Sequence, residues 1–321
     1  MNKKQTLLFL VGFGLGVAQA NAKEVNSVKE TNLNAAAPAT AESTVAAENS
    51  TLQKIKKNRV ISLGVRESSI PFSYTLGSDK YAGYSYDIAQ KVVAAAKDKL
   101  KLKELIVKTI PITSQNRIPL LQNGTIDIEC GSTTNNLERQ KQAAFTNSIF
   151  VIGTRLMTRK GSEIKDFDDL KSKTVVTTAG TTSERLLRKM NDDKNMGMNI
   201  ISAKDHAQSD LMLENGRAVA FMMDDALLYG EIAKAKDPSL WTVVGTPQSY
   251  EAYGCMLRKD DPEFKKLADD TISKMMKTGE MATLYDKWFM KPVPPKGMVL
   301  NFPLSDAMKK LYAEPNDKAF E

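Results

Sequence analysis

The chain has 321 residues, which is long enough for two lobes with separate hydrophobic cores. Its formal net charge is +7, and the 45 basic and 38 acidic residues are mixed along the sequence rather than gathered into basic, aromatic-rich blocks. This pattern argues against nucleic-acid binding and gives weak support to an anionic small ligand.

Residues 1–22 have the pattern of a secretory signal peptide. Two lysines precede the apolar run LLFLVGFGLGVA, and small residues follow it, so we expect cleavage after Ala20 or Ala22. The apolar run is too short to form a membrane span. Residues 23–50 are rich in Ala, Ser, Thr, Asn and Glu and contain no aromatic residue, which predicts a disordered leader. We therefore expect a soluble protein that is exported to the periplasm.

The folded part is expected to start at Thr51 with the helix TLQKIKKN, followed by the strand RVISLGVR. From there strands alternate with helices, which predicts a mainly parallel α/β sheet. The phrases LQNGTIDIECG and LENGRAVAFMM share one form: a helix end, Asn-Gly, and a buried strand followed by polar residues. This likeness predicts two units of the same type, with ligand groups at the carboxyl ends of the strands.

The stretch IDIECGSTTNNLER is the first candidate site. A buried strand leads through a glycine into three hydroxyl residues, which include Ser132 and Thr134. A helix start follows, with a capping box that begins at Asn135, and Arg139 lies in the first turn. Hydroxyl groups, backbone N–H groups and a bidentate guanidinium together predict a carboxylate receptor. The alternative is a plain helix cap with a surface arginine.

A second glycine and hydroxyl turn occupies residues 180–183. It opens a helix in which Glu184 stands at capping-box spacing from Thr181. The N–H groups of Thr182 and Ser183 would then be exposed at a helix N-terminus, where anions bind. The alternative is again a helix cap without a ligand.

The sequence contains two cysteines, Cys130 and Cys255. After export they would meet an oxidising compartment, which permits a disulfide between them. The sequence alone leaves two free thiols as the alternative.

Several phrases together resemble the polar amino-acid solute-binding proteins of ABC importers, and most of all the glutamate/aspartate-binding branch. They cover the chain from about Leu52 onward and include GVRESSIPFSY, SQNRIPLLQNGTIDIECGSTTNNLERQ, TTAGTTSE, SAKDHAQS, AVAFMMDDALL and EAYGCMLRKDDPEFKKL. The resemblance implies a two-lobed periplasmic-binding-protein-like α/β fold of type II, with two hinge strands. It implies a first lobe from residues 51–152 and 255–321 and a second lobe from residues 153–254.

An α-amino acid carries a carboxylate and an ammonium on one carbon, so its receptor needs both charge signs at close range. Arg139 with Ser132 and Thr134 is expected to bind the α-carboxylate from the first lobe. Asp224 follows the strand AVAFMM at the position of the family's amine-binding aspartate. Its neighbour Asp225 is the alternative for that role, the other aspartate then being a helix cap.

A second carboxylate on the ligand would need further donors. Arg66 ends the strand VISLGV, Ser114 and Arg117 open the helix after TIPITS, and His206 is the only histidine of the chain. The resemblance implies that Arg66 and Arg117 contact a side-chain carboxylate, and His206 matches the same branch. The alternatives are solvated surface arginines and a histidine that caps a helix.

The expected function is capture of L-glutamate or L-aspartate and its delivery to an inner-membrane ABC importer permease. We expect a monomer without cofactor or metal. The competing class is an enzyme, since dehydratases occur on the same two-lobed fold. The sequence lacks a G-x-S-x-G elbow, a metal-ligand cluster and a phosphate loop, which disfavours that class. A sensor that delivers ligand to a receptor is a third alternative.

Overall fold

The computed structural model describes residues 50–319. The expected signal peptide and residues 23–49 of the expected leader lie outside the described residues. Ser50 does not belong to a leader: it is buried, and its Oγ accepts a hydrogen bond of 3.3 Å from the N–H of Gln53 as the N-cap of α2 (Thr51–Asn58). Every helix within residues 50–319 is too short or too polar to cross a lipid bilayer.

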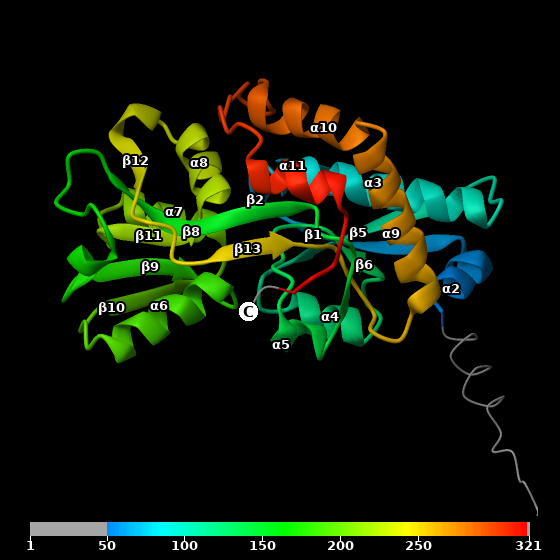
Figure 1. Ribbon diagram of the computed structural model, residues 1–321, viewed down its shortest axis with the longest axis horizontal. Helices are drawn as coiled ribbons and strands as arrows, with labels where there is room; N and C mark the ends of the chain where they lie inside the picture. The colour runs from blue at the N-terminus through cyan, green and yellow to red at the C-terminus, as the bar shows by residue number, and fades with distance from the viewer. Residues whose placement is uncertain (1–49, 320–321) are drawn as a thin grey trace, which may run out of the picture. The chain divides into compact units, whose positions relative to one another are not determined.

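The first sheet has five strands in the order β5-β1-β6-β14-β7 (Figure 1). β1 is parallel to β5 and β6, whereas β14 is antiparallel to β6 and β7. The strands are β1 (Val60–Arg66), β5 (Ile106–Ile112), β6 (Ile128–Glu129), β7 (Ala144–Phe145) and β14 (Met256–Leu257). The helices of this part of the chain are α3 (Tyr84–Lys99), α4 (Arg117–Gln122), α5 (Leu137–Gln140), α9 (Pro262–Lys277), α10 (Glu280–Tyr285) and α11 (Asp306–Ala313). A small antiparallel sheet of β2 (Ser68–Ser69), β3 (Ser73–Gly77) and β4 (Lys80–Ala82) follows β1.

The second sheet has the order β10-β9-β11-β8-β12, with β13 paired to β8 off this path. Parallel pairing joins β9 to β10 and β11, and antiparallel pairing joins β8 to β11, β12 and β13. The strands are β8 (Phe150–Arg159), β9 (Thr174–Thr178), β10 (Asn199–Ala203), β11 (Ala220–Asp224), β12 (Trp241–Val244) and β13 (Tyr250–Tyr253). The helices are α6 (Thr182–Asp193), α7 (His206–Glu214) and α8 (Asp225–Lys234).

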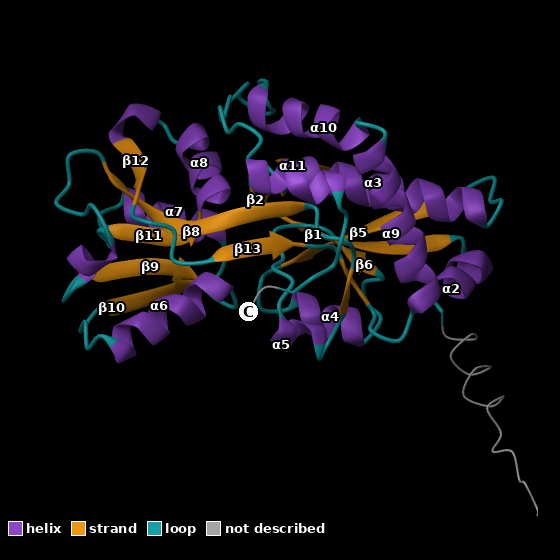
Figure 2. Cartoon of the chain, viewed as in Figure 1, coloured by secondary structure: helices purple, strands orange, loops and turns teal. Residues whose placement is uncertain are grey.

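The expected two-lobed α/β fold is confirmed, but the expectation of a mainly parallel sheet is wrong, because both sheets are mixed. Parallel pairs occur where a helix connects two strands. The antiparallel pairs involve the strands by which the chain leaves and re-enters the first sheet, since these strands need no helical crossover. Figure 2 shows strands at the centre of each sheet region and helices on their faces.

β8 and β13 are the two strands that connect the sheets. They pair antiparallel, with Phe150 opposite Tyr253 and Gly153 opposite Tyr250, and Figure 1 shows them side by side between the two sheets. The expected lobe boundaries fall inside β8, at 152/153, and between β13 and β14, at 254/255. The exact division of the chain stays a prediction.

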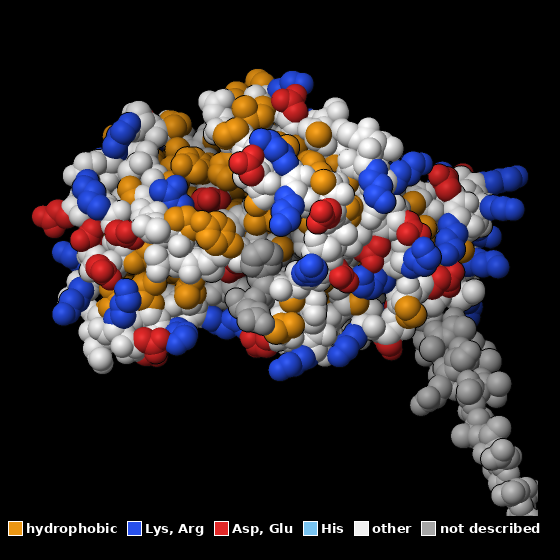
Figure 3. Space-filling model, in the orientation of Figure 1, with side chains coloured by type: hydrophobic (Ala, Val, Ile, Leu, Met, Phe, Trp, Pro, Cys, Tyr) orange, Lys and Arg blue, Asp and Glu red, His pale blue; other side chains and the backbone are white. Residues whose placement is uncertain are grey.

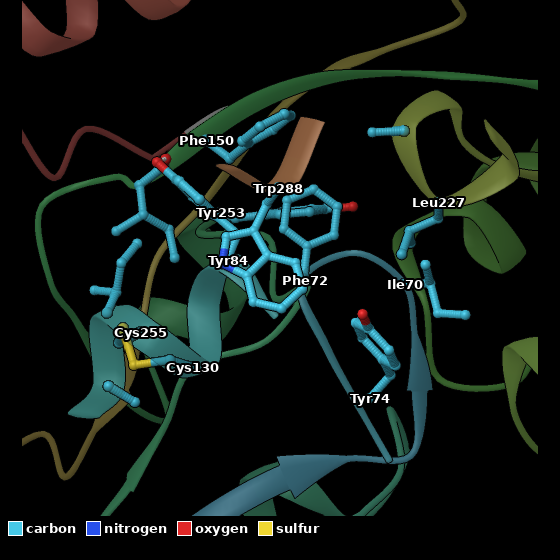
Figure 4. Packing of buried hydrophobic residues seen from close by; sticks show 14 of the residues in the cluster. Ile70, Phe72, Tyr74, Tyr84, Cys130, Phe150, Leu227, Tyr253, Cys255 and Trp288 are labelled. Carbon is cyan, nitrogen blue, oxygen red and sulfur yellow. Dashed lines mark hydrogen bonds between the residues drawn. A yellow bond between two sulfur atoms is a disulfide. The ribbon is translucent and has the colours of Figure 1, made fainter. Parts of the chain in front are cut away.

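An aromatic core anchors one end of each connecting strand in the first lobe (Figure 4). The ring of Phe72 lies edge-on to Phe150 of β8 and to Tyr253 of β13, with ring centroids 4.8 and 5.1 Å apart. Phe150 also stacks on Phe289 at 4.9 Å. Such pairs contribute about 0.5–1.5 kcal/mol each beyond the burial of their area. The first residue of β8 and the last residue of β13 are therefore fixed by packing in the first lobe.

A disulfide joins Cys130, which follows β6, to Cys255, which precedes β14. This confirms the pairing that the sequence left open. Both residues are buried beside the aromatic core, as Figure 4 shows. One segment of the first sheet precedes the second sheet in the sequence and the other follows it, and the disulfide links these two segments covalently.

Replacing both cysteines by serine should lower the free energy of unfolding by about 2–5 kcal/mol, because a long-range cross-link restricts the unfolded chain. Urea denaturation followed by circular dichroism measures the change. Treatment of the unchanged protein with dithiothreitol is the control and should produce a similar loss. Equal midpoints for the oxidised, reduced and serine forms would contradict the prediction.

Candidate functional site

Five buried charged side chains, three from strands β1, β11 and β13 and two from helices α4 and α5, converge on one region between the lobes. They are Arg66, Arg117, Arg139, Asp224 and Glu251, with exposed fractions between 1% and 6%. Among residues 50–319, none of these five side chains forms an ion pair. Buried charges without an opposite partner are costly, so they mark a site for a charged ligand.

Arg66 is the last residue of β1, and the pleat of that strand points its side chain into the site. Its Nη2 donates to Ser114 Oγ at 3.0 Å, and its Nη1 donates to Ser132 Oγ at 3.4 Å. Burial lowers the pKa of Arg66 to about 10, and the nearby charge of Arg117 adds to the effect. The guanidinium is therefore held by neutral hydroxyls rather than by an anion.

Arg117 begins α4 and is also fully buried. Its Nη1 donates to Thr133 Oγ1 at 2.6 Å, and the Thr133 hydroxyl donates to Glu129 Oε2 at 2.8 Å. Its Nε has no hydrogen-bond partner among the described residues. Burial lowers the pKa of Arg117, whereas Glu129 counteracts this shift. Thr133 and Glu129 thus hold the Arg117 guanidinium in place through a chain of hydrogen bonds. The sequence alone does not assign this role.

Arg139 reaches from the first lobe to the second. Its Nη1 donates to the carbonyl oxygen of Thr134 at 2.9 Å, and its Nη2 donates to the carbonyl oxygen of Gly180 at 3.4 Å. Burial and the charge of Arg117 lower the pKa of Arg139 to about 9. The expected cap at Asn135 is wrong by one position: Asn136 Oδ1 caps α5 by accepting from the N–H of Arg139, whereas Asn135 Oδ1 accepts from Gln140 Nε2 at 2.8 Å.

His206 is buried at the start of α7. Its Nδ1 lies 2.8 Å from Thr178 Oγ1, and its Nε2 lies 3.4 Å from Arg66 Nη2. Burial, followed by the charges of Arg66 and Arg117, lowers the pKa of His206 well below its ordinary value. Because arginine can only donate, the neutral ring accepts at Nε2 and orients Arg66 from the opposite lobe.

Asp224, and not Asp225, faces the site. Tyr253 Oη donates to Asp224 Oδ2, and Ser183 Oγ lies 3.3 Å from Asp224 Oδ1. Asp225 is in the first turn of α8, where its Oδ1 accepts from the N–H of Ala226 at 2.8 Å. Burial raises the pKa of Asp224 to about 8, and the nearby charge of Glu251 adds to the rise. Among residues 50–319, no cationic side chain forms an ion pair with Asp224.

Glu251 is a site residue that the sequence did not reveal. It lies on β13, and its Oε2 accepts from Thr182 Oγ1 at 2.6 Å and from Thr134 Oγ1. One threonine belongs to each lobe, and their hydroxyl oxygens are 3.4 Å apart. The only sequence signal was an acidic residue in the otherwise apolar and aromatic strand YEAY.

The turn before α6 folds as expected, with one difference. Thr181 Oγ1 caps the helix by accepting from the N–H of Glu184 at 3.0 Å. The Glu184 carboxylate accepts from the N–H of Gly180 at 2.8 Å rather than from that of Thr181. The first-turn N–H groups of Thr182 and Ser183 have no intrahelical partner, so they can donate to an anion.

The site therefore has a positive part of three arginines and a negative part of two carboxylates. It brings together all ten sequence-predicted residues: Arg66, Ser114, Arg117, Ser132, Thr134, Arg139, Thr182, Ser183, His206 and Asp224. Clusters of His, Cys, Asp and Glu suited to a metal ion do not occur within residues 50–319. The charge pattern fits a small molecule that carries anionic groups and a cationic group.

A family model of bacterial extracellular solute-binding proteins, family 3, matches residues 61–291. The chain belongs to this family. The glutamate/aspartate import solute-binding protein of Salmonella typhimurium is 64% identical over 279 residues, which cover 87% of this chain and 92% of the relative. The L-glutamate/L-aspartate-binding protein of Pseudomonas aeruginosa is 64% identical over 273 residues, with coverage of 84% and 90%.

Solved structures agree with this membership. A variant of ArgBP from T. maritima matches with a TM-score of 0.65 at 26% identity, over 74% of this chain and 98% of that chain. The ancestral amino acid-binding protein AncCDT-1, described as a precursor of cyclohexadienyl dehydratase, matches with a TM-score of 0.64 at 27% identity. It covers 74% of this chain and 99% of that one.

Asp224→Asn should remove part of the pH dependence of stability. The folded-state pKa of about 8 lies above the ordinary value of 3.8, so the folded protein holds this proton more tightly than the unfolded chain. The contribution of Asp224 to stability is therefore largest below pH 4 and is lost as the pH rises towards 8. Asparagine does not titrate and still accepts from Tyr253.

Thermal melting of the protein without added ligand, from pH 5 to pH 9, measures this effect. The melting temperature of the Asn variant should exceed that of the unchanged protein more at pH 8 than at pH 5. Asp260→Asn is the matched control at an exposed position and should leave the pH profile unchanged. Parallel profiles for Asp224→Asn and the unchanged protein would show that Asp224 does not hold a proton in the folded state.

Proposed function

We propose that this protein captures L-glutamate or L-aspartate between its lobes and delivers it to an inner-membrane ABC importer permease. The observation that carries the proposal is the set of buried charges without ion-pair partners among residues 50–319. A dicarboxylic amino acid has two anionic groups and one cationic group, which complements three arginines and the nearby carboxylates. The names of the relatives from Salmonella typhimurium and Pseudomonas aeruginosa support the same ligand class.

Each charged group of the ligand has a place in this proposal. Arg139 and the first-turn N–H groups of α6 bind the α-carboxylate, since they approach from opposite lobes beside Gly180. Arg66 and Arg117 bind the side-chain carboxylate, and Asp224 binds the ammonium. The neutral His206 ring holds Arg66 in place.

Selectivity follows from the cost of leaving buried charges unpaired. A neutral amino acid such as glutamine would leave Arg66 and Arg117 without an anion, and a basic amino acid would add repulsion to them. The acidic amino acids are the class that compensates the arginines without leaving Asp224 unpaired.

Capture is proposed to proceed by closure of the lobes. Arg66 meets His206, Arg139 meets Gly180, and Thr134 meets Thr182 across the interface. A ligand that contacts both lobes binds this closed state more tightly than an open state, so it shifts the population towards closure. We propose that the permease recognises the closed form and that the protein acts as a periplasmic monomer.

Isothermal titration calorimetry of the ligand-stripped protein against the twenty common amino acids tests the ligand class. Glutamate and aspartate should release or absorb heat with saturable binding, and glutamine, arginine and the apolar amino acids should not. Tight binding of glutamine or arginine together with silence for glutamate would refute the proposal.

Alanine variants of the three arginines separate their roles. Arg139→Ala should weaken every amino acid that still binds, because all share the α-carboxylate. Arg66→Ala and Arg117→Ala should act mainly on acidic ligands, since each leaves a buried side-chain carboxylate short of a partner. Each loss should cost on the order of 2–5 kcal/mol of binding free energy.

The exposed Arg217→Ala is the control and should bind like the unchanged protein. Calorimetric dissociation constants for glutamate and aspartate give the comparison. Equal small effects at all three buried arginines would place the ligand elsewhere.

Gly230 tests the closing motion. It lies in α8, and a Cβ at this position would stand 2.3 Å from the carbonyl oxygen of Ile70 in the first lobe. Gly230→Ala should therefore obstruct closure and weaken glutamate binding by more than tenfold, which corresponds to about 1.4 kcal/mol. The ligand-free melting temperature should stay equal or rise, because alanine favours the interior of a helix over glycine by about 0.5–1 kcal/mol.

Small-angle scattering of the same variant gives a second reading. The unchanged protein should become more compact when glutamate is added, and Gly230→Ala should show a smaller decrease in radius of gyration at the same ligand concentration. If the variant closes and binds normally, the close approach of α8 to Ile70 is not required for closure.

A further inference from the structure

Glu251 has a position unlike that of the other acidic residues. It is buried on a strand that connects the lobes, with 5% of its surface exposed, and makes no ion pair among residues 50–319. Its Oε2 accepts from one hydroxyl of each lobe, those of Thr134 and Thr182. Its Oε1 lies 3.3 Å from Ser249 Oγ. The carboxylate therefore stands at the point where the two halves of the site meet.

The hydrogen bonds of Glu251 fix what the two threonine hydroxyls can do. Each hydroxyl has one proton to donate and two lone pairs to accept with. When the protons of Thr134 and Thr182 are both directed to the Glu251 carboxylate, neither is left for a ligand carboxylate. The 3.4 Å contact between the two hydroxyl oxygens then presents lone pairs only.

These lone pairs suit a primary ammonium. An ammonium has three donors and no acceptor, and Asp224 at the end of β11 provides a carboxylate that can accept from it. Thr182 precedes Ser183, whose Oγ lies 3.3 Å from Asp224 Oδ1. The threonine hydroxyls and Asp224 thus form a group of acceptors, and Glu251 adds a buried negative charge behind it.

Resting on the proposed function, we propose that Glu251 determines specificity for the amino group of the ligand. It holds the Thr134 and Thr182 hydroxyls as acceptors for the ammonium and supplies a second negative charge beside Asp224. A dicarboxylate of the same length without an amino group, such as glutarate, is rejected. It would leave these acceptors unpaired next to a buried anion.

Glu251→Gln tests the proposal, because it removes the charge while retaining the size of the side chain. Its amide can also donate, which frees the threonine protons for other acceptors. Calorimetry should show the dissociation constant of L-glutamate rising by on the order of tenfold or more, as expected for losing a hydrogen-bonded charge. The dissociation constant of glutarate should stay equal or fall, so the preference for glutamate over glutarate decreases.

Three matched variants separate the charge of Glu251 from its position and from its threonine partners. Glu163→Gln changes the same charge at an exposed position and should leave both dissociation constants unchanged. Glu251→Asp keeps the charge and should retain more of the preference than Glu251→Gln. Thr182→Val removes one acceptor and its hydrogen bond to Glu251 but keeps the Glu251 charge. It should also reduce the preference if Glu251→Gln proves too unstable to measure.

The outcomes distinguish this inference from the proposed function. If the unchanged protein does not bind glutamate, the proposed function fails. If it binds glutamate and glutarate equally, or if Glu251→Gln weakens both by the same factor, the proposed function stands and the role of Glu251 is wrong. A parallel loss would mean that Glu251 only holds the lobes together. Unchanged or tighter glutamate binding in Glu251→Gln would equally overturn the inference.

Discussion

The burial of arginine charge without an anion is the constraint on which the rest of the structure depends. Burial lowers the pKa of all three arginines, Arg66, Arg117 and Arg139. The groups that accept their hydrogen bonds are neutral, and the Glu129 carboxylate is reached only through the Thr133 hydroxyl. Such an arrangement survives only when rigid surroundings prevent the side chains from turning outward to water. The aromatic core and the sheet of the first lobe supply that rigidity. The favourable packing of the first lobe therefore offsets the cost of burying the arginine charges in the site.

The fold brings opposite charges to one place from segments that are far apart in sequence. β1 ends at Arg66 and β11 ends at Asp224, and both lie at the carboxyl ends of parallel strands, where open α/β sheets bind ligands. The connecting strands add Glu251 and Tyr253 between these ends. Outside the site, basic and acidic side chains are intermingled over much of the surface face shown in Figure 3, so the segregation of charge is an internal feature.

Residues at the ends of regular elements could be predicted from the sequence, whereas those defined by tertiary contact could not. Arg66 and Asp224 close strands with clear apolar patterns, so their position followed from the pattern, and the resemblance supplied their roles. The role of Glu251 could not be predicted from the sequence, because its partners Thr134 and Thr182 lie 117 and 69 positions away. The mixed character of the sheets could not be predicted for a similar reason. Antiparallel β14 has only two residues, and its neighbours are determined by where the chain re-enters the first sheet.

Cys130 and Cys255 are 125 positions apart, and their disulfide closes a covalent ring that contains every strand of the second sheet. A single peptide-bond cleavage within that ring leaves both broken ends attached to the first sheet through sulfur. The two pieces of the nicked chain stay covalently joined under oxidising conditions. Proteolytic cleavage within the second sheet therefore does not release a fragment by itself, and separation of the pieces also requires reduction of the disulfide.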